Sequence, residues 1–311
     1  MLKFDGNFVV IMELSRSIAF ENSLKSLDTE NWLDRKFYRP IGFYIALLLR
    51  KSPITPNMVT IFSIFVGVSA GLLFYPPNVW INLSGVSLLV FANILDCVDG
   101  QLARITGIKS KIGRVLDGLS GEIWFTVIYL VLTFRLMHQM NWGIWVLGIA
   151  FLSGASHFMQ ASILDYYKTL HLHILKGGMN SEFENTQSIH RKATSFSWKK
   201  QPFHRLIQMM YYWYTVNQEK QTPHLQEYIL HLKTSYPDGI PEHEIQRFRA
   251  NSLIMMPLLD LFTFNARSIV LFLSVLFNIG WFYFFFEIFL LNPLFLMAIR
   301  RHEKMMIHLI V

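Results

Sequence analysis

The stretch that decides the fold is residues 96–122, DCVDGQLARITGIKSKIGRVLDGLSGE, which lies between two strongly apolar runs. Three of its carboxylates, Asp96, Asp99 and Asp117, stand close to the ends of those runs. Charged side chains inside or beside a membrane are costly to keep there and are usually functional. The function is therefore to be sought in these polar residues, which the apolar runs hold in place.

The spacing of the aspartates predicts a metal site. Successive residues of a helix are about 100° apart, so Asp96 and Asp99, three positions apart, share a face. Asp117 opens the next apolar run, so three carboxylates from two helices can converge. Hard divalent cations such as Mg²⁺ and Mn²⁺ bind in oxygen-rich sites of this kind. The alternative is two helix ends with solvated charges, but an ordinary connection at a membrane edge needs no such set of acids at helical spacing.

Two glycines and an arginine accompany the aspartates. Gly100 and Gly113 have no side chain, so a phosphate or a nucleotide can approach the backbone closely at these positions. Arg104 stands four residues after Gly100, on the same helical face, and its guanidinium can hold a phosphate through two parallel hydrogen bonds. The stretch therefore favours a metal site that also binds a phosphate compound.

These residues resemble the signature of the CDP-alcohol phosphatidyltransferases, which is written D-x2-D-G-x2-A-R-x8-G-x3-D-x3-D. The chain matches it through the third aspartate, as Asp96-x2-Asp99-Gly100-x2-Ala103-Arg104-x8-Gly113-x3-Asp117. The stretch Pro53 to Thr60, which contains Thr55-Pro56-Asn57, is similar to the entry to the first membrane span in that family. The resemblance is specific over residues 53–122 and only topological beyond them.

The resemblance implies an enzyme of phospholipid or related phosphodiester biosynthesis. Such an enzyme transfers a substituted phosphate from a CDP-linked donor, such as CDP-diacylglycerol, to an alcohol and releases CMP. The resemblance also implies a homodimer and two ions of Mg²⁺ or Mn²⁺, with Asp96, Asp99 and Asp117 as ligands. Binding of the nucleotide is carried over onto Gly100, Ala103, Arg104 and Gly113. The signature contacts the part of the donor that all members share, so it leaves the acceptor alcohol open.

The final aspartate of the signature is missing. It would fall at position 121, which is Gly121, and the next residue is Glu122. In the family this aspartate is a metal ligand and the general base, and we expect Glu122 to take both roles. Glu122 lies about 140° from Asp117 around a regular helix, instead of about 40°. The longer Glu side chain or a π-bulge, eased by Gly118 and Gly121, would have to correct this direction. The alternative is that Glu122 only caps the helix start, where the helix dipole favours a negative charge.

The composition identifies an integral membrane protein. Of the 311 residues 52% are hydrophobic and only 16% are charged, and the mean hydropathy is +0.34. The net charge of +7 does not indicate nucleic acid, because the basic residues flank apolar runs and form no stripe with interleaved aromatics. Membrane lipids with anionic headgroups are the simpler partner. The single cysteine, Cys97, excludes an intrachain disulfide and is expected to be a small buried residue.

The apolar runs predict an all-α, polytopic membrane protein with six transmembrane helices. An interfacial helix over residues 41–49, too short to span, precedes them. The expected spans are residues 57–75, 80–98, 116–134, 142–164 and two within the apolar run 268–299. The segment from Arg135 to Asn141 connects the third span to the fourth. Asn278 and Gly280, near the middle of the last run, predict a tight hairpin.

Four segments follow from these spans. Residues 1–52 form a cytosolic N-terminal segment with the interfacial helix, and residues 1–40 show no pattern typical of a cleaved signal peptide. Residues 53–164 hold the first four spans and the active-site motif. Residues 165–264 form a polar, basic insert with candidate amphipathic helices at 206–214 and 227–232. Residues 265–311 hold the last two spans and a basic tail.

The distribution of Lys and Arg predicts the orientation. The N-terminal segment, the loop 99–115, the insert and the tail after residue 299 are basic, whereas the turns 76–79 and 278–281 carry neither Lys nor Arg. Six spans place every basic segment on the cytosolic side, while one long fifth span would leave the tail outside. We therefore expect a multi-pass protein with its active site at the cytosolic face, in the cytoplasmic membrane if the source is bacterial.

Other polar residues lie within the expected spans. His157 and Gln160 in the fourth span can line a polar acceptor pocket or form hydrogen bonds between helices. Glu287 in the last span needs a partner, because a lone carboxylate there is expensive, and His157 is a candidate. His171 and His173 do not share a helical face and are a weak indication of metal.

Three classes of function are compatible with the sequence. The first is an active transferase. The second is a catalytically inactive relative that binds nucleotide or lipid, or acts as a membrane scaffold, because the last aspartate is absent. The third is a transporter that uses intramembrane acids for ion coupling, which Arg104 and the two glycines near it disfavour.

Overall fold

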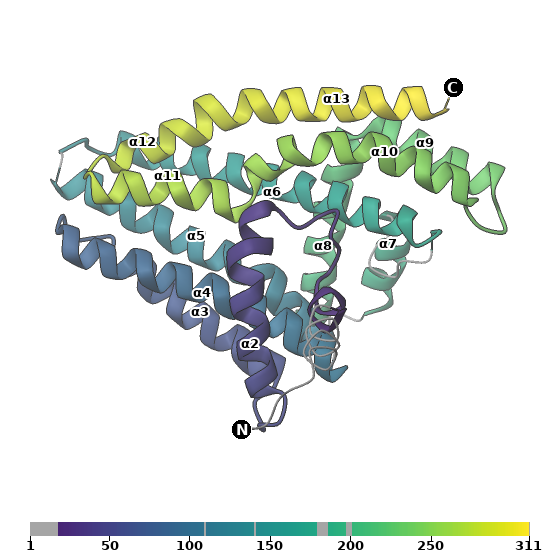
Figure 1. Ribbon diagram of the computed structural model, residues 1–311. Helices are drawn as coiled ribbons and strands as arrows, with labels where there is room; N and C mark the ends of the chain where they lie inside the picture. Colours follow the sequence, from purple (N-terminus) through teal and green to yellow (C-terminus); the bar gives the residue numbers. More distant parts are fainter. Residues whose placement is uncertain (1–17, 109, 140, 179–185, 197–200, 311) are drawn as a thin grey trace, which may run out of the picture. The chain divides into compact units, whose positions relative to one another are not determined.

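The computed structural model describes residues 18–108, 110–139, 141–178, 186–196 and 201–310. All the regular structure in these ranges is helical, which confirms the all-α prediction (Figure 1). Among the described residues, five helices are long and apolar enough to cross a membrane, consistent with an integral membrane protein. The signal-peptide expectation falls in part on the first seventeen residues, which lie outside the described ranges, as does Lys109 of the predicted basic loop.

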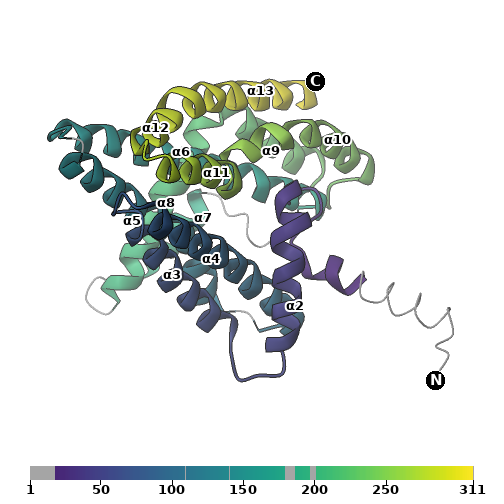
Figure 2. The same cartoon turned by 60° about the vertical axis from the view of Figure 1, so that its left-hand side comes forward.

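The chain divides into two compact units, and the first carries the aspartate motif. This unit comprises Met1–Gly154 and Phe264–Phe286. Its helical elements are η1 (Asp34–Tyr38), α2 (Arg39–Leu49), α3 (Pro56–Leu72), α4 (Val79–Thr106), α5 (Lys111–Gln139), the beginning of α6 (Trp145–Leu175), α11 (Phe264–Leu276) and α12 (Gly280–Phe285). The helices α3, α4 and α5 lie against one another and bring the two halves of the motif together (Figures 1 and 2).

Capping residues fix where the motif-bearing helices begin and end. The side chain of Thr55 accepts a hydrogen bond from the backbone N–H of Met58, and Pro56 occupies the first turn of α3. Asn78 caps α4 by accepting from the N–H groups of two residues in its first turn. Gly107, with φ +73°, ends α4 in the left-handed conformation that glycine tolerates best. The helix start predicted from Pro53 to Thr60 is therefore confirmed.

Small residues allow α3 to approach its neighbours closely. A Cβ on Gly67 would lie 2.4 Å from the ring of the buried Trp124 on α5, and one on Gly71 would lie 3.2 Å from Ile128. On the other flank, a Cβ on Gly85 of α4 would lie 2.8 Å from the ring of Phe74. These close approaches set the distance between the helices and hence the positions of the carboxylates at their ends.

The helix α2 crosses α4 near the motif (Figures 1 and 2). A Cβ on Gly42 would lie 2.6 Å from Oε1 of Gln101 and 3.1 Å from Cβ of Cys97, so the two backbones are close. Cys97 is buried, as expected. A helix that crosses a span in this way can lie along the membrane surface, and the interfacial role of α2 stays a prediction.

The structure refines the expected spans. The first corresponds to α3, which has 17 residues and is shorter than the five candidate spans, so the six-span arrangement stays a prediction. The hairpin in the run 268–299 is confirmed, because α11 ends at Leu276, α12 begins at Gly280, and Asn278 adopts a φ of +57° between them. The third span was expected to end at residue 134, but α5 continues to Gln139.

The insert expected up to residue 264 contains an apolar helix that the sequence reading missed. Helix α10 (Glu242–Leu259) continues through η2 (Asp260–Phe262) into α11, and Glu242–Leu276 is a candidate span of 35 residues. The charged residues at the start of α10 concealed the apolar stretch that follows them, LIMMPLLDLF at 253–262. The predicted segment boundaries stay a prediction.

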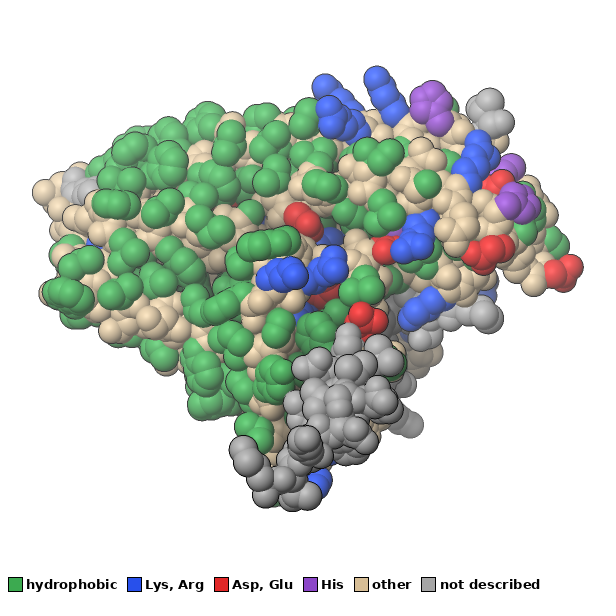
Figure 3. Space-filling model, in the orientation of Figure 1, with side chains coloured by type: hydrophobic (Ala, Val, Ile, Leu, Met, Phe, Trp, Pro, Cys, Tyr) green, Lys and Arg blue, Asp and Glu red, His purple; other side chains and the backbone are tan. Residues whose placement is uncertain are grey.

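Exposed apolar side chains cover the helices of the first unit. On α3, Ile61, Phe62 and Phe65 are exposed, and on α11 Ile269 and Leu273 are exposed. In Figure 3, hydrophobic side chains dominate the left-hand part of the face, where α3 and α11 lie in Figure 1. A continuous apolar surface of this kind is expected where lipid tails replace water.

The second unit comprises Ala155–Thr263 and Glu287–Val311. It contains the rest of α6, then α7 (Thr186–Ser195), α8 (Pro202–Gln221), α9 (Pro223–Ser235), α10, η2, most of η3 (Phe286–Leu291) and α13 (Asn292–Ile310). The helices predicted at 206–214 and 227–232 are confirmed within α8 and α9. The fourth span was expected to end at residue 164, but α6 continues to Leu175.

Candidate metal centre

The structure brings the three predicted aspartates together. Asp96 and Asp99 come from α4 and Asp117 from the first turns of α5, and one carboxylate oxygen of each lies within 4.8 Å of the others. Asp99 is buried, Asp96 is half-buried and Asp117 is exposed, so the cluster is open on one side. Three carboxylates at this separation fit the oxygen donor set that Mg²⁺ and Mn²⁺ prefer.

Two hydroxyl groups orient the carboxylates. Thr60 of α3 donates a hydrogen bond to Oδ2 of Asp99. Ser120, one turn after Asp117 on α5, contacts Oδ1 of Asp96 at 2.7 Å and the backbone carbonyl of Asp117 at 2.8 Å. Groups that orient metal ligands in this way raise the affinity of a metal site. The sequence reading missed Ser120, although it lies three residues after Asp117 on the same helical face.

The start of α5 is tied to the start of α3 by a small polar cluster. The backbone N–H of Gly113 donates to Oγ of Ser110 at 2.8 Å, and Nδ2 of Asn57 donates to the same oxygen at 3.0 Å. A Cβ on Gly113 would lie 2.2 Å from Oδ1 of Asn57, which no ordinary contact allows. Gly113 is therefore needed for this approach. The sequence placed Asn57 only in the stretch that enters the first span.

We expect Gly113→Ala to lower both the melting temperature and any transferase activity, because the added methyl group pushes Asn57 away and displaces the start of α5 beside Asp117. The matched control is Gly118→Ala on the same helix, where an added Cβ meets nothing within 4 Å. That change should keep or raise stability by up to about 1 kcal/mol through helix propensity. Thermal unfolding in detergent and activity assays compare the two variants, and an equal response would contradict the role given to Gly113.

Arg104 lies beside Gly100, and one of its guanidinium nitrogens has no hydrogen-bond acceptor among the described residues. Its Nε donates to the backbone carbonyl of Ser23, whereas its Nη2 is buried without a hydrogen-bond acceptor among the described residues. A Cβ on Gly100 would lie 3.2 Å from Nη2. An orphaned guanidinium nitrogen next to a glycine fits a phosphate ligand. Ala103 is half-buried one residue before Arg104, and its part in nucleotide binding stays a prediction.

Glu122 stands apart from the three aspartates. It is absent from the carboxylate cluster of the described residues. The helix α5 is α-helical throughout, so no π-bulge turns Glu122 back toward Asp117. Arg267 on α11 is close enough for its charge to act on Glu122. A Cβ on Gly121, the position of the missing aspartate, would meet nothing within 4 Å. The role of Glu122 as metal ligand and general base stays a prediction. It requires the Glu122 side chain to turn toward the aspartates.

Other polar residues singled out from sequence make polar contacts between helices in the second unit. Nδ1 of His157, the candidate partner, lies 3.8 Å from Oε1 of the fully buried Glu287. Nε2 of Gln160 donates to Oδ1 of Asn292 at 2.8 Å, and Nδ2 of Asn292 donates to Oγ of Ser156 at 2.9 Å. These contacts tie α6 to η3 and α13 and account for His157 and Gln160 without an acceptor pocket.

Comparison with known proteins decides the family. The family description CDP-alcohol phosphatidyltransferase matches residues 53–222, which are 170 of the 311 residues. This chain belongs to the CDP-alcohol phosphatidyltransferase family. The match begins at the entry to α3, where the sequence resemblance began, and extends through α5 and α6 as far as the end of α8. The resemblance is therefore broader than the motif alone indicated.

One curated relative shares part of the chain. The archaetidylinositol phosphate synthase of Pyrococcus horikoshii is 45% identical over 64 residues, which are 21% of this chain and 32% of that protein. The match thus spans about a third of the relative's length. CDP-alcohol phosphatidyltransferases act in phospholipid synthesis, and membership in the family supports a phosphotransferase activity for this chain.

Proposed function

We propose that this CDP-alcohol phosphatidyltransferase catalyses metal-dependent transfer of a substituted phosphate from a CDP-linked lipid, such as CDP-diacylglycerol, to an alcohol, with release of CMP. The observation that carries the proposal is the convergence of Asp96, Asp99 and Asp117 within 4.8 Å at the junction of α4 and α5. Family membership supports the reaction type. The orphaned Nη2 of Arg104 supports a phosphate-bearing ligand beside the carboxylates.

Each group of the site has a distinct part in this proposal. Asp96, Asp99 and Asp117 would hold two ions of Mg²⁺ or Mn²⁺, which supply neutralisation of the pyrophosphate charge and stabilise the leaving CMP. Arg104 binds a phosphate of the donor through its free Nη2, and Gly100 and Gly113 let the donor approach the backbone. Positioning and charge neutralisation are the main sources of catalysis in phosphoryl transfer. No covalent intermediate on the protein is required.

Because the last aspartate of the signature is missing, we assign the role of general base to Glu122. As the general base, Glu122 would take the proton from the acceptor hydroxyl as that oxygen attacks the phosphorus. Its direction on α5 and its proximity to Arg267 mean that the side chain must turn toward the acceptor when substrate is bound. Catalytic contacts often tighten only in the substrate complex.

The acceptor alcohol, the side of the membrane that carries the active site and the oligomeric state are also proposals. The name of the Pyrococcus relative makes an inositol phosphate the first alcohol to test, followed by glycerol phosphate, serine and inositol. The basic segments around the motif support an active site at the cytosolic face of the membrane. A homodimer follows from the resemblance to the family and can be checked by the mass of the purified protein in detergent.

The deciding experiment measures CMP release by the purified protein in detergent. The mixture contains CDP-diacylglycerol, one alcohol from the panel and Mn²⁺ or Mg²⁺. We expect CMP release that needs the donor, one of the alcohols and the metal, and that EDTA abolishes. Saturable binding of the CDP-donor without CMP release from any alcohol would reject the enzyme and support a non-catalytic relative, the alternative that Gly121 favours.

A further inference from the structure

A second polar site lies at the far end of α5 from the aspartates. Arg135 is 3% exposed, although the residue is one turn from the end of the helix. Asp117 and Arg135 are 18 positions apart on α5, which is about 27 Å along the axis and close to the thickness of a bilayer's hydrocarbon core. Arg135 therefore belongs to the opposite membrane interface from the metal centre.

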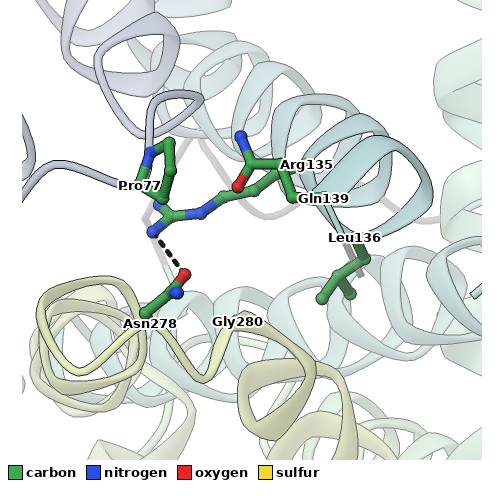
Figure 4. Close-up of a pocket in the computed structure, with 6 residues that line it drawn as sticks. All are labelled: Pro77, Arg135, Leu136, Gln139, Asn278 and Gly280. Carbon is green, nitrogen blue, oxygen red and sulfur yellow. Dashed lines mark hydrogen bonds between the residues drawn. The ribbon is translucent and has the colours of Figure 1, made fainter. Parts of the chain in front are cut away.

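Arg135 connects three segments of the first unit: the residues after α3, the start of α4 and the turn between α11 and α12. Its Nη1 donates to the backbone carbonyl of Phe74 at 2.5 Å and contacts Oδ1 of Asn82 at 3.4 Å. Its Nη2 donates to Oδ1 of Asn278 at 2.8 Å, in the turn between α11 and α12 (Figure 4). All three acceptors are neutral. No carboxylate among the described residues compensates the charge of Arg135, and the three hydrogen bonds that it makes with them use Nη1 and Nη2 and leave Nε–H over.

A cavity of about 210 Å³ opens beside this guanidinium. It is lined by Pro77, Arg135, Leu136, Gln139, Asn278 and Gly280. Figure 4 shows the side chains of Arg135 and Asn278 meeting at the edge of this space. The cavity is smaller than the 300 to 1,000 Å³ that is typical of sites for drug-sized ligands, so it suits a single small group.

The hydrogen bonds to three segments explain why an arginine stands here, but they do not balance its charge. Burying an uncompensated charge is costly, and lysine or arginine near a helix end usually extends its head toward water instead. Nε and Nη2 lie on the edge of the guanidinium that pairs with phosphate through parallel hydrogen bonds. An anion in the cavity would use the free Nε–H and neutralise the charge.

We propose that the Arg135 cavity binds a phosphate group at the membrane interface opposite the metal centre, supplied either by a phospholipid headgroup of that leaflet or by free phosphate. The site is separate from the transfer reaction and independent of whether the chain is catalytic. Its occupant would bridge the segments that Arg135 joins and stabilise the first unit.

The test variant is Asn278→Asp, because Arg135→Gln would remove the link between the three segments and with it a reason for the unit to fold. The aspartate keeps an oxygen acceptor for Arg135, tolerates the positive φ at this position, and replaces the anion by a covalently attached carboxylate. The matched control is Asn141→Asp, which adds the same charge at an exposed residue with a φ of +53° outside the cavity.

The full-length protein in detergent is examined with two probes. Inorganic phosphate is titrated while the melting temperature is followed, and phosphatidylglycerol retained after incubation is measured by native mass spectrometry. We expect at least one probe to bind the unchanged protein and Asn141→Asp equally well and to bind Asn278→Asp at least tenfold more weakly. In the absence of anion, Asn278→Asp should keep the melting temperature of the unchanged protein.

Stabilisation by phosphate identifies free phosphate as a ligand, whereas retention of lipid without stabilisation by phosphate identifies the headgroup. Equal binding by Asn278→Asp, or no binding of either probe by the unchanged protein, would overturn the proposal.

Discussion

Replacing Asp96 or Asp99 by asparagine is expected to lower kcat/KM for CMP release by at least about a hundredfold, since loss of a group that merely orients a metal ligand already costs ten- to a hundredfold. Each change removes a negative ligand oxygen and keeps the size of the side chain. An amide oxygen at position 96 can still accept from Ser120, and an amide at position 99 can still bond to Thr60. The variants should therefore fold.

The control for these variants is Asp238→Asn, at an exposed position in the turn before α10. It changes the net charge by the same amount and should leave turnover and its dependence on metal concentration unchanged. Thermal unfolding of all three variants shows whether a loss of activity reflects loss of structure. Near-normal turnover in either Asp96→Asn or Asp99→Asn would show that these carboxylates do not hold the catalytic metal.

Glu122→Gln is expected to lower kcat by a factor of about 10² to 10⁴ while leaving donor binding nearly unchanged, as is typical when a general base is lost. The side chain keeps its shape but loses the charge that interacts with Arg267 on α11. If Glu122 serves only as the partner of Arg267, the variant should instead lose melting temperature and keep its turnover.

Gly121→Asp provides a second, independent variant. It restores the aspartate of the family signature, and a Cβ at this position meets nothing within 4 Å, so the change fits the described surroundings. Position 121 lies about 40° from Asp117 around the helix, on the metal-binding side. Combined with Glu122→Gln, it should recover a large part of the lost turnover. Full activity of Glu122→Gln alone would exclude Glu122 as the base.

The sequence predicted the convergence of the three aspartates well because its information is local. Asp96 and Asp99 share a helical face by spacing alone, and Asp117 opens the helix that follows a short loop. Thr55 and Pro56 mark the start of α3 by capping chemistry, which depends on neighbouring residues. The hairpin at Asn278 was found because no single span accommodates the apolar run around it.

What the sequence could not predict depends on contacts between segments far apart in the chain. Thr60 orients Asp99 from 39 positions away, and Arg135 reaches a turn 143 positions later. From sequence, Arg135 marked the end of a span, because an arginine in an apolar helix is expected at the interface and its acceptors on other helices cannot be foreseen. The direction of Glu122 likewise depended on whether α5 contains a π-bulge, which no residue pattern decides.

The most direct test of the metal centre is binding of Mn²⁺ to the purified protein, followed by electron paramagnetic resonance as free Mn²⁺ is depleted. This measurement needs no substrate and no knowledge of the acceptor. The account predicts saturable binding to the unchanged protein and to Asp238→Asn, and loss of that binding when Asp96 and Asp99 are both replaced by asparagine. Undiminished Mn²⁺ binding in the double variant would contradict the assignment of the aspartates as the metal centre.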